Sequence, residues 1–192
     1  MKCALPLVMM GAICGAVIVA APGVAAHLRG VLRNEPVGQG MAGSTRAHTE
    51  ERFSFIANAP MERVAPLFGA EGERMWAPDW DPQFVYPMPA VDQEGMVFTV
   101  AHERGKSVWV NTEFDAKNGR IQYVYVIPDI MVTLITLRLT PGGKQTRVEV
   151  KYDRTSLSPE SDAHVRQTAE QHHKGTDWER EVNGYLGKEN RN

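Results

Sequence analysis

The 192-residue sequence contains almost no cysteine and no excess of charge of either sign. Its only two cysteines, Cys3 and Cys14, lie near the N-terminus, so the rest of the chain can form no disulfide and offers no thiolate nucleophile or cysteine metal ligand. The 21 basic residues are scattered among 23 acidic ones, and the net charge is −2. Because nucleic-acid-binding domains present a basic surface, we expect no nucleic-acid partner.

The sequence also lacks the familiar signatures of catalytic and cofactor sites. It contains no Ser-His-Asp order, EF-hand or dinucleotide-binding fingerprint, and the pair Gly142-Gly143 lacks the context of a phosphate-binding loop. His172 and His173 are adjacent, so on a helix their side chains point about 100° apart and cannot ligate one metal ion together. A tetrahedral zinc site needs three or four converging ligands. We therefore predict no cofactor and no metal site.

A long, uncharged and mostly apolar run occupies residues 3–26, directly after Lys2. Val24 and Ala26 supply small residues at the −3 and −1 positions of a cleavage site, which is the layout of a secretory signal peptide. The alternative is an uncleaved membrane anchor, because residues 4–21 are about long enough to cross a hydrocarbon core. Both interpretations place the folded part of the chain outside the cytoplasm.

Composition divides the chain into three regions. Residues 1–26 form the signal peptide or N-terminal membrane anchor, residues 27–46 a flexible linker, and residues 47–188 one folded domain. The linker is rich in Gly and has no periodic apolar face. We expect the domain to be periplasmic or secreted, or held at the membrane through residues 4–26 if these are not removed.

Residues 96–152 have the pattern of four or five β-strands in direct succession. Val148, Val150 and Tyr152 alternate with charged residues, which indicates a strand with one buried and one solvated face. Asn118-Gly119 is a strong hairpin signal, because a tight type I′ turn needs positive φ at both central residues. Short turns between the strands predict an antiparallel meander. The same alternation is repeated, more loosely, at Phe98 and Val100 and at Val108, Val110 and Phe114.

Shorter elements flank this meander. Residues 51–57 predict a strand, and residues 61–68 a short helix that Pro66 bends or shortens. A further helical turn is predicted at residues 71–76. The strand at residues 83–87 is expected at an edge of the sheet, because Pro87 cannot donate to a ladder.

A long polar helix is predicted from Ser161 to about Leu186, and Ser158 is an alternative cap. Its apolar residues form two sets, one containing Val165 and one containing Trp178, and the sets are rotated by more than about 90° from each other. Gly175 lies between them and permits a kink that would let both face one surface. Otherwise one set covers a cavity and the other packs on a different element.

This order of elements resembles the helix-grip fold of the START-like, Bet v 1-like superfamily, also called SRPBCC or polyketide cyclase/dehydrase-like proteins. The resemblance extends from Glu51 to about Leu186 and rests on residues 53–64 (FSFIANAPMERV), on residues 76–87 (WAPDWDPQFVYP) and on the turn Pro141-Gly142-Gly143. It implies an α+β fold in which a curved seven-stranded antiparallel sheet wraps around a long C-terminal helix, with two short helices after the first strand. It also implies a largely apolar cavity. Members bind lipids, sterols, polyketides or other hydrophobic molecules, and some catalyse cyclisation or dehydration.

A curved sheet and one amphipathic helix leave a gap between them, which becomes a mostly apolar pocket. Inward-facing side chains are therefore candidates for its wall. His102 and His172, if both face inward, would serve as a general base and its orienting partner, because histidine titrates near neutral pH. The predicted ligand-binding residues are Phe98, His102, Val110, Tyr123, Tyr125, Thr133, Ile135, Val150, Tyr152, Val165, Ala169 and His172.

Two groups of aromatic residues have alternative interpretations. Trp76 and Trp80 lie in a stiff loop, where the indoles either plug one end of the core or line a ligand entrance. Tyr123 and Tyr125 share one face of a strand, where their hydroxyls are either bonded within the protein or available to a ligand. The sequence does not choose between these readings.

The sequence favours an exported protein that binds a hydrophobic small molecule or lipid in an internal cavity. The alternative is an enzyme of the cyclase/dehydrase kind that uses the same cavity with a His or Tyr as acid–base group. A third hypothesis is a membrane-tethered interaction module with a solid interior, which would leave no cavity of about 300 Å³ or more.

Overall fold

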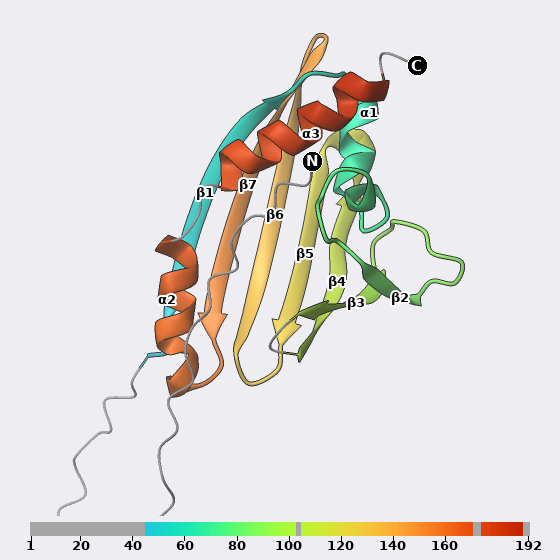
Figure 1. Cartoon of the computed structure of the whole chain (residues 1–192). Coiled ribbons are helices and arrows are strands. Elements are labelled where there is room, and N and C mark those ends of the chain that lie inside the picture. The colour runs from blue at the N-terminus through green and yellow to red at the C-terminus, as the bar shows by residue number, and fades with distance from the viewer. Residues whose placement is uncertain (1–44, 103–104, 171–173, 190–192) are drawn as a thin grey trace, which may run out of the picture. The chain divides into compact units, whose positions relative to one another are not determined.

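The computed structural model describes residues 45–102, 105–170 and 174–189 (Figure 1). The predicted signal peptide or anchor, and nearly all of the predicted linker, lie outside these residues. Among the helices that the structure describes, none combines the length and the apolarity needed to cross a membrane. The described residues belong to one unit, Gly43–Asn192.

Seven antiparallel strands form one curved sheet (Figure 1). The spatial order is β1-β7-β6-β5-β4-β3-β2, so β2 to β7 form a continuous meander, and β1 and β2 are the edges. The predicted meander and the edge position of β2 are confirmed. The strands are β1 His48–Ala57, β2 Pro82–Tyr86, β3 Val97–His102, β4 Gly105–Asp115, β5 Arg120–Ile127, β6 Met131–Gly142 and β7 Gln145–Ser156.

A bulge in β4 decides which residues of that strand face the concave side. The register between β4 and β5 shifts between Asn111 and Glu113, so that Trp109 and Asn111 before the bulge share a face with Phe114 after it. Val110, which was predicted to face inward, therefore lies on the opposite face. That prediction was wrong because simple alternation from Phe114 back to Val110 ignores the extra residue.

The hairpin between β4 and β5 is present where Asn118-Gly119 predicted it, but its turn is longer than a type I′ turn. Residues Ala116–Asn118 form a 3-10 turn, η3, and only Gly119 then has positive φ, at 68°. The Asp115 carboxylate accepts a hydrogen bond from the backbone N–H of Asn118 at 3.2 Å. A Cβ atom at Gly119 would lie 2.3 Å from the carbonyl oxygen of Leu139, so this position requires glycine for two reasons.

Three short helices follow β1, namely α1 Met61–Val64, η1 Ala65–Phe68 and η2 Gly72–Met75. The change from α-helix to 3-10 helix occurs beside Pro66, as the missing N–H of proline predicts. Val64 and Phe68 are fully buried against the core. These turns carry the chain from the edge strand β1 across one end of the concave face to β2.

The structure describes the predicted C-terminal helix as two segments, one on each side of residues 171–173. After a 3-10 turn, η4 Pro159–Ser161, α2 spans Asp162–Glu170 and α3 spans Lys174–Glu189. Val165 of α2 packs with Ala47, Ile127 and Met131, whereas Val182 of α3 belongs to the main core. The two apolar sets therefore pack on different parts of the sheet.

The main core lies between the concave face of the sheet and the covering helices. Figure 1 shows α3 crossing this face toward α1. Strands β5, β6 and β7 contribute alternate residues to the core, which is the period-two pattern expected of a sheet with one buried face. The fully or nearly fully buried members include Phe55, Phe68, Ile121, Leu137, Val148, Val150, Val182 and Leu186.

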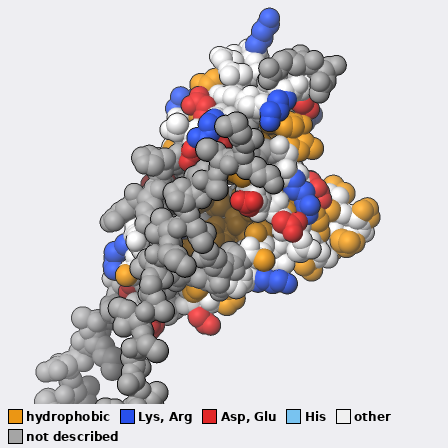
Figure 2. Space-filling model, viewed as in Figure 1, with side chains coloured by type: hydrophobic (Ala, Val, Ile, Leu, Met, Phe, Trp, Pro, Cys, Tyr) orange, Lys and Arg blue, Asp and Glu red, His pale blue; other side chains and the backbone are white. Residues whose placement is uncertain are grey.

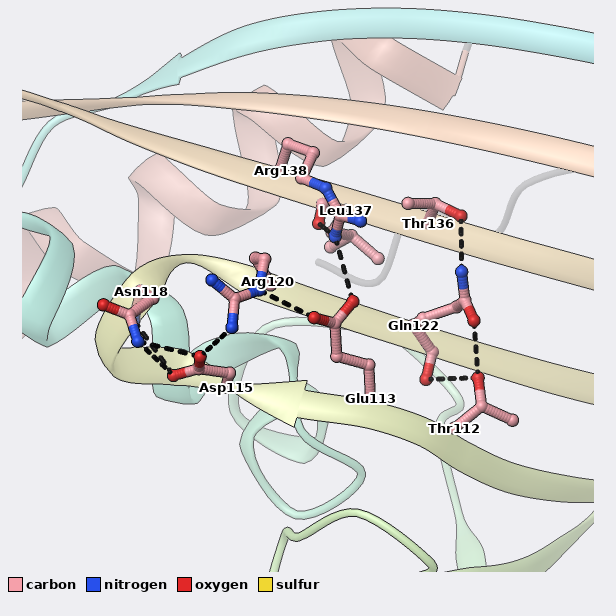
Figure 3. Close-up of polar contacts among 9 residues, drawn as sticks. All are labelled: Thr112, Glu113, Asp115, Asn118, Arg120, Gln122, Thr136, Leu137 and Arg138. Atoms are coloured by element: carbon pink, nitrogen blue, oxygen red, sulfur yellow. Dashed lines mark hydrogen bonds and ion pairs between the residues drawn. The ribbon is translucent and has the colours of Figure 1, made fainter.

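The opposite face of β4, β5 and β6 carries a polar network (Figure 3). Glu113 contacts Arg120 at 2.7 Å and Arg138 at 3.3 Å, and Arg120 also pairs with Asp115. Because exposed ion pairs each contribute little, these contacts mark the solvated face of the sheet more than they stabilise it. The concave face is therefore the apolar side of the sheet.

Candidate functional site

A pocket of about 390 Å³ opens between the segment from η2 to Trp80, the concave face of the sheet and α3. Figure 2 shows a hollow on this side with hydrophobic side chains at its base. This volume lies within the usual range for small-molecule sites, about 300–1,000 Å³. It argues against the hypothesis of a solid interior. The lining residues are Glu73, Trp76, Ala77, Pro78, Trp80, Trp109, Tyr123, Ile135, Tyr152, Asp177, Trp178, Arg180 and Glu181.

Three of the four tryptophans in the lining are fixed by hydrogen bonds from their indole N–H groups. Trp76 donates to the carbonyl oxygen of Leu67 at 2.6 Å, and Trp80 donates to that of Ala70 at 2.8 Å. Trp109 donates to the Ser107 hydroxyl at 2.8 Å. Since the N–H groups are already bonded, these indoles offer the pocket mainly carbon and π surface.

The fourth tryptophan, Trp178, brings α3 into the wall. Its ring stacks on Phe68 with the centroids 5.9 Å apart and meets Trp76 edge-on at 5.2 Å. It also contacts Phe53 edge-on at 5.6 Å. A Cβ atom at Gly175 would lie 3.2 Å from the Phe53 side chain, so glycine permits the close approach of α3 to β1.

Among the acidic residues that line the pocket, Glu73 has the pKa that is raised by its surroundings. Burial raises the pKa of its carboxyl well above the usual 4.5, and the nearby charge of Asp92 raises the pKa further. Its carboxylate has no hydrogen bond or ion pair among the described residues. Asp92 instead accepts the backbone N–H of Ala70 at 2.7 Å and so holds the segment that carries Glu73.

Two tyrosines of the sheet face the same pocket. The Tyr123 side chain is 3% exposed, and its buried hydroxyl has no hydrogen-bond partner in the structure. Burial is the main reason that its pKa, and that of Tyr152, is raised, and the charge of Glu73 contributes to both. Both hydroxyls are therefore protonated at physiological pH.

The rim of the pocket on α3 contains one basic and two acidic residues. Arg180 contacts Asp177 at 2.7 Å and Glu181 at 3.0 Å. These contacts are exposed and worth little to stability, but they compensate the positive charge of Arg180. The rim therefore presents no uncompensated positive charge to a ligand in the pocket.

The structure brings three of the predicted site residues to the pocket, namely Tyr123, Ile135 and Tyr152. Phe98 and Tyr125 do not line the pocket but contact it indirectly. Their rings stack on the lining residue Trp109, with centroid distances of 5.6 Å and 4.3 Å. A ligand-binding role for these five residues stays a prediction.

The other predicted site residues are not brought to this pocket. Thr133 and Val150 are buried on the concave face outside the lining, and Val110 lies on the opposite face. Val165 is buried in the second core cluster, and Ala169 is half-buried on α2 outside the lining. His102 ends β3, where its backbone pairs with Gly105, and His172 lies outside the described residues. The pocket is therefore covered by α3, whereas the sequence favoured α2.

Sequence reasoning missed the role of Glu73, Trp109 and Trp178 in the pocket. Trp109 was not considered, because Val110 was predicted to face inward and the bulge was not recognised. Trp178 had been recognised as an apolar position of the helix, but its set was not chosen. For Glu73 the only local signal was its place in a short helical turn before Trp76, and nothing there predicts burial of its carboxyl.

Within the described ranges, no group of three or more His, Cys, Asp or Glu side chains is placed to hold a metal ion. Of the three acids of the lining, Asp177 and Glu181 both contact Arg180. The pocket is better suited to an organic ligand than to an ion coordinated by carboxylates.

No family model matches the sequence, and no curated protein matches it. Solved structures do match. Norcoclaurine synthase from Thalictrum flavum has a TM-score of 0.58 at 7% identity, covering 83% of this chain and 99% of that one. Ara h 8.0201 has a TM-score of 0.54 at 10% identity, covering 74% of this chain and 99% of that one. A protein from Arthrobacter aurescens has a TM-score of 0.51 at 16% identity, covering 72% and 86%. With its curved seven-stranded sheet, short helices after β1 and C-terminal helix, the chain has a Bet v 1-like helix-grip fold, as its sequence pattern predicted.

Proposed function

We propose that this protein binds a hydrophobic small molecule or lipid in the pocket beneath α3, and that it does so outside the cytoplasm. The observation that carries the binding proposal is a pocket of about 390 Å³ whose wall contains four tryptophans. Indole rings offer large apolar contact area at low entropic cost, which suits a ligand with a flat or branched hydrophobic body. Export is supported by the apolar run of residues 3–26 alone.

The first test is mass spectrometry under native conditions, on protein purified from its own host, to detect a bound small molecule. The second is a titration with a fluorescent hydrophobic probe. In the variant Ala77→Trp an indole replaces a half-buried methyl in the lining, and we expect probe binding to be lost. Ala163→Trp, at an exposed position of α2, is the matched control and should bind like the wild type. Equal binding by both variants would refute the pocket assignment.

A second candidate function is an enzyme of the cyclase/dehydrase kind. It is supported by Glu73 and Tyr123, an acid with raised pKa and an unpartnered hydroxyl in one pocket, which are the parts of a general acid–base pair. Mass spectrometry separates the two candidates. A binding protein carries the same small molecule in both forms, in equal or smaller amount in Glu73→Gln, whereas an enzyme retains an unconverted precursor of different mass in the variant.

A further inference from the structure

The hydrogen-bonding of the indoles leaves the pocket without their N–H donors. Trp76, Trp80 and Trp109 each use the N–H within the protein, at 2.6 Å, 2.8 Å and 2.8 Å. Phe98 and Tyr125 stack on Trp109, so it is the π systems of Trp76 and Trp80 that remain for a ligand. The face of an indole carries partial negative charge. Tryptophan is the aromatic residue that attracts a cation most strongly.

The charges of the lining act in the same direction. Three acids line the pocket, Glu73, Asp177 and Glu181, and within the described part of the chain the one basic residue of the lining is Arg180. Arg180 already contacts both Asp177 and Glu181, so its charge is compensated at the rim. The carboxylate of Glu73 has no such partner among the described residues. The interior of the pocket is therefore electrostatically negative once Glu73 is ionised.

A buried hydroxyl adds an acceptor beside these groups. Tyr123 lines the pocket, and its buried hydroxyl has no hydrogen-bond partner in the structure. Buried polar groups in folded proteins nearly always have a partner, so an open one in a pocket indicates a ligand that supplies it. An N–H or O–H group of a ligand would satisfy this oxygen.

We propose that the ligand is an organic cation, a protonated amine or quaternary ammonium group on a hydrophobic body, with its charge held between the Glu73 carboxylate and the indole faces. This inference deepens the proposed function and rests on it. A neutral lipid would cover the half-buried Glu73 and give its carboxyl no partner, and a fatty-acid carboxylate would be repelled by its charge. Burial favours a protonated Glu73 in the empty pocket, and an entering cation would favour loss of that proton.

The test compares two probes of nearly the same shape that differ in charge. Benzyltrimethylammonium is a cation, and 2,2-dimethylpropylbenzene is its neutral carbon isostere. Binding of each to the purified protein is followed by the change in tryptophan fluorescence at pH 8. We expect the cation to bind at least about tenfold more tightly than the isostere, the scale of one charged contact in a partly desolvated site.

Glu73→Gln keeps the shape of the side chain and removes its charge, so it should lose most of this preference while still binding the neutral isostere. Glu94→Gln, at an exposed position outside the lining, is the matched control and should keep it. The wild-type comparison needs no variant and stands even if Glu73→Gln were to fold poorly.

Each outcome separates the two levels of the proposal. If the wild type binds the neutral isostere as tightly as the cation, or if Glu73→Gln keeps the full preference, the cation inference is overturned and the pocket remains a hydrophobic binding site. If neither probe binds the wild type, the cation inference and the proposed binding function both fail.

Discussion

Replacing Glu73 by Gln should make the empty protein more stable at neutral and alkaline pH. Glu73 lies in the pocket wall, burial and the charge of Asp92 raise its pKa above 4.5, and its carboxylate has no partner among the described residues. In the unfolded chain the same carboxyl is solvated and ionises at its ordinary pKa. The folded state therefore binds this proton more tightly than the unfolded state.

The sign of the pH dependence follows from this difference. Where the folded pKa lies above the unfolded one, the unfolded state loses its proton first as pH rises, so stability falls from about pH 4.5 up to the folded pKa. Below about pH 4 both states are protonated and the penalty is absent. Gln carries no charge at any pH, so the variant avoids this loss.

The expected size comes from the cost of an unsatisfied buried group, about 1–3 kcal/mol. Because the pocket admits some water to Glu73, we expect a gain of about 1–2 kcal/mol for Glu73→Gln at pH 8 and none within error at pH 4. Urea unfolding at both pH values, followed by tryptophan fluorescence, gives the two free energies of unfolding. Glu94→Gln, an exposed carboxyl, serves as the control and should show no such pH-dependent gain.

Two results would refute this reasoning. One is a variant that is less stable than the wild type at pH 8, which would mean that the Glu73 carboxylate makes a favourable contact. The other is a difference between variant and wild type that does not change with pH, because a protonation effect must vanish where both states hold the proton.

Two further predictions concern other parts of the molecule, and a third concerns ligand binding at Glu73. Arg154, fully buried on β7, contacts Glu51 at 3.0 Å and lies over the Tyr152 ring at 4.3 Å. Arg154→Ala should lower the free energy of unfolding by about 3–5 kcal/mol, since one member of a buried pair is lost; a loss of less than about 1 kcal/mol in denaturant titration would contradict this. Gly119→Ala should be clearly more destabilising than Gly143→Ala, because both positions have positive φ, but only at Gly119 would the new Cβ meet a backbone oxygen, at 2.3 Å. Thermal melting checks this pair, and equal effects would remove the steric part of the explanation. Finally, benzyltrimethylammonium should bind the wild type more tightly as pH rises through the titration of Glu73, whereas its binding to Glu73→Gln should depend less on pH. The other titratable and charged groups around Glu73 are Asp92, Asp177, Glu181, Arg180, Tyr123 and Tyr152. If the affinities of wild type and variant change with pH in parallel, ionised Glu73 is not the group that meets the cation.

The order and type of the elements were determined by local patterns that the sequence displays directly. The alternation at Val148, Val150 and Tyr152 identified a half-buried strand, and the structure has these three side chains on the buried face of β7. Pro66 marked the change to a 3-10 helix, and Asn118-Gly119 marked a hairpin. Such features depend on neighbours in sequence, so the resemblance to the helix-grip fold followed without coordinates.

The site depended on contacts between segments far apart in the chain. One extra residue in β4 placed Trp109 on the concave face of the sheet and Val110 on the opposite face. In the C-terminal region, Trp178 of α3 lines the pocket, whereas Val165 of α2 packs in the second core cluster. Glu73 gained its unusual pKa only because the loop around Asp92, the sheet and α3 enclose it. The sequence by itself thus determined the strands, turns and fold class, while tertiary structure alone decided the pocket, because burial and electrostatic environment belong to the assembled neighbourhood of a side chain and not to its place in the chain.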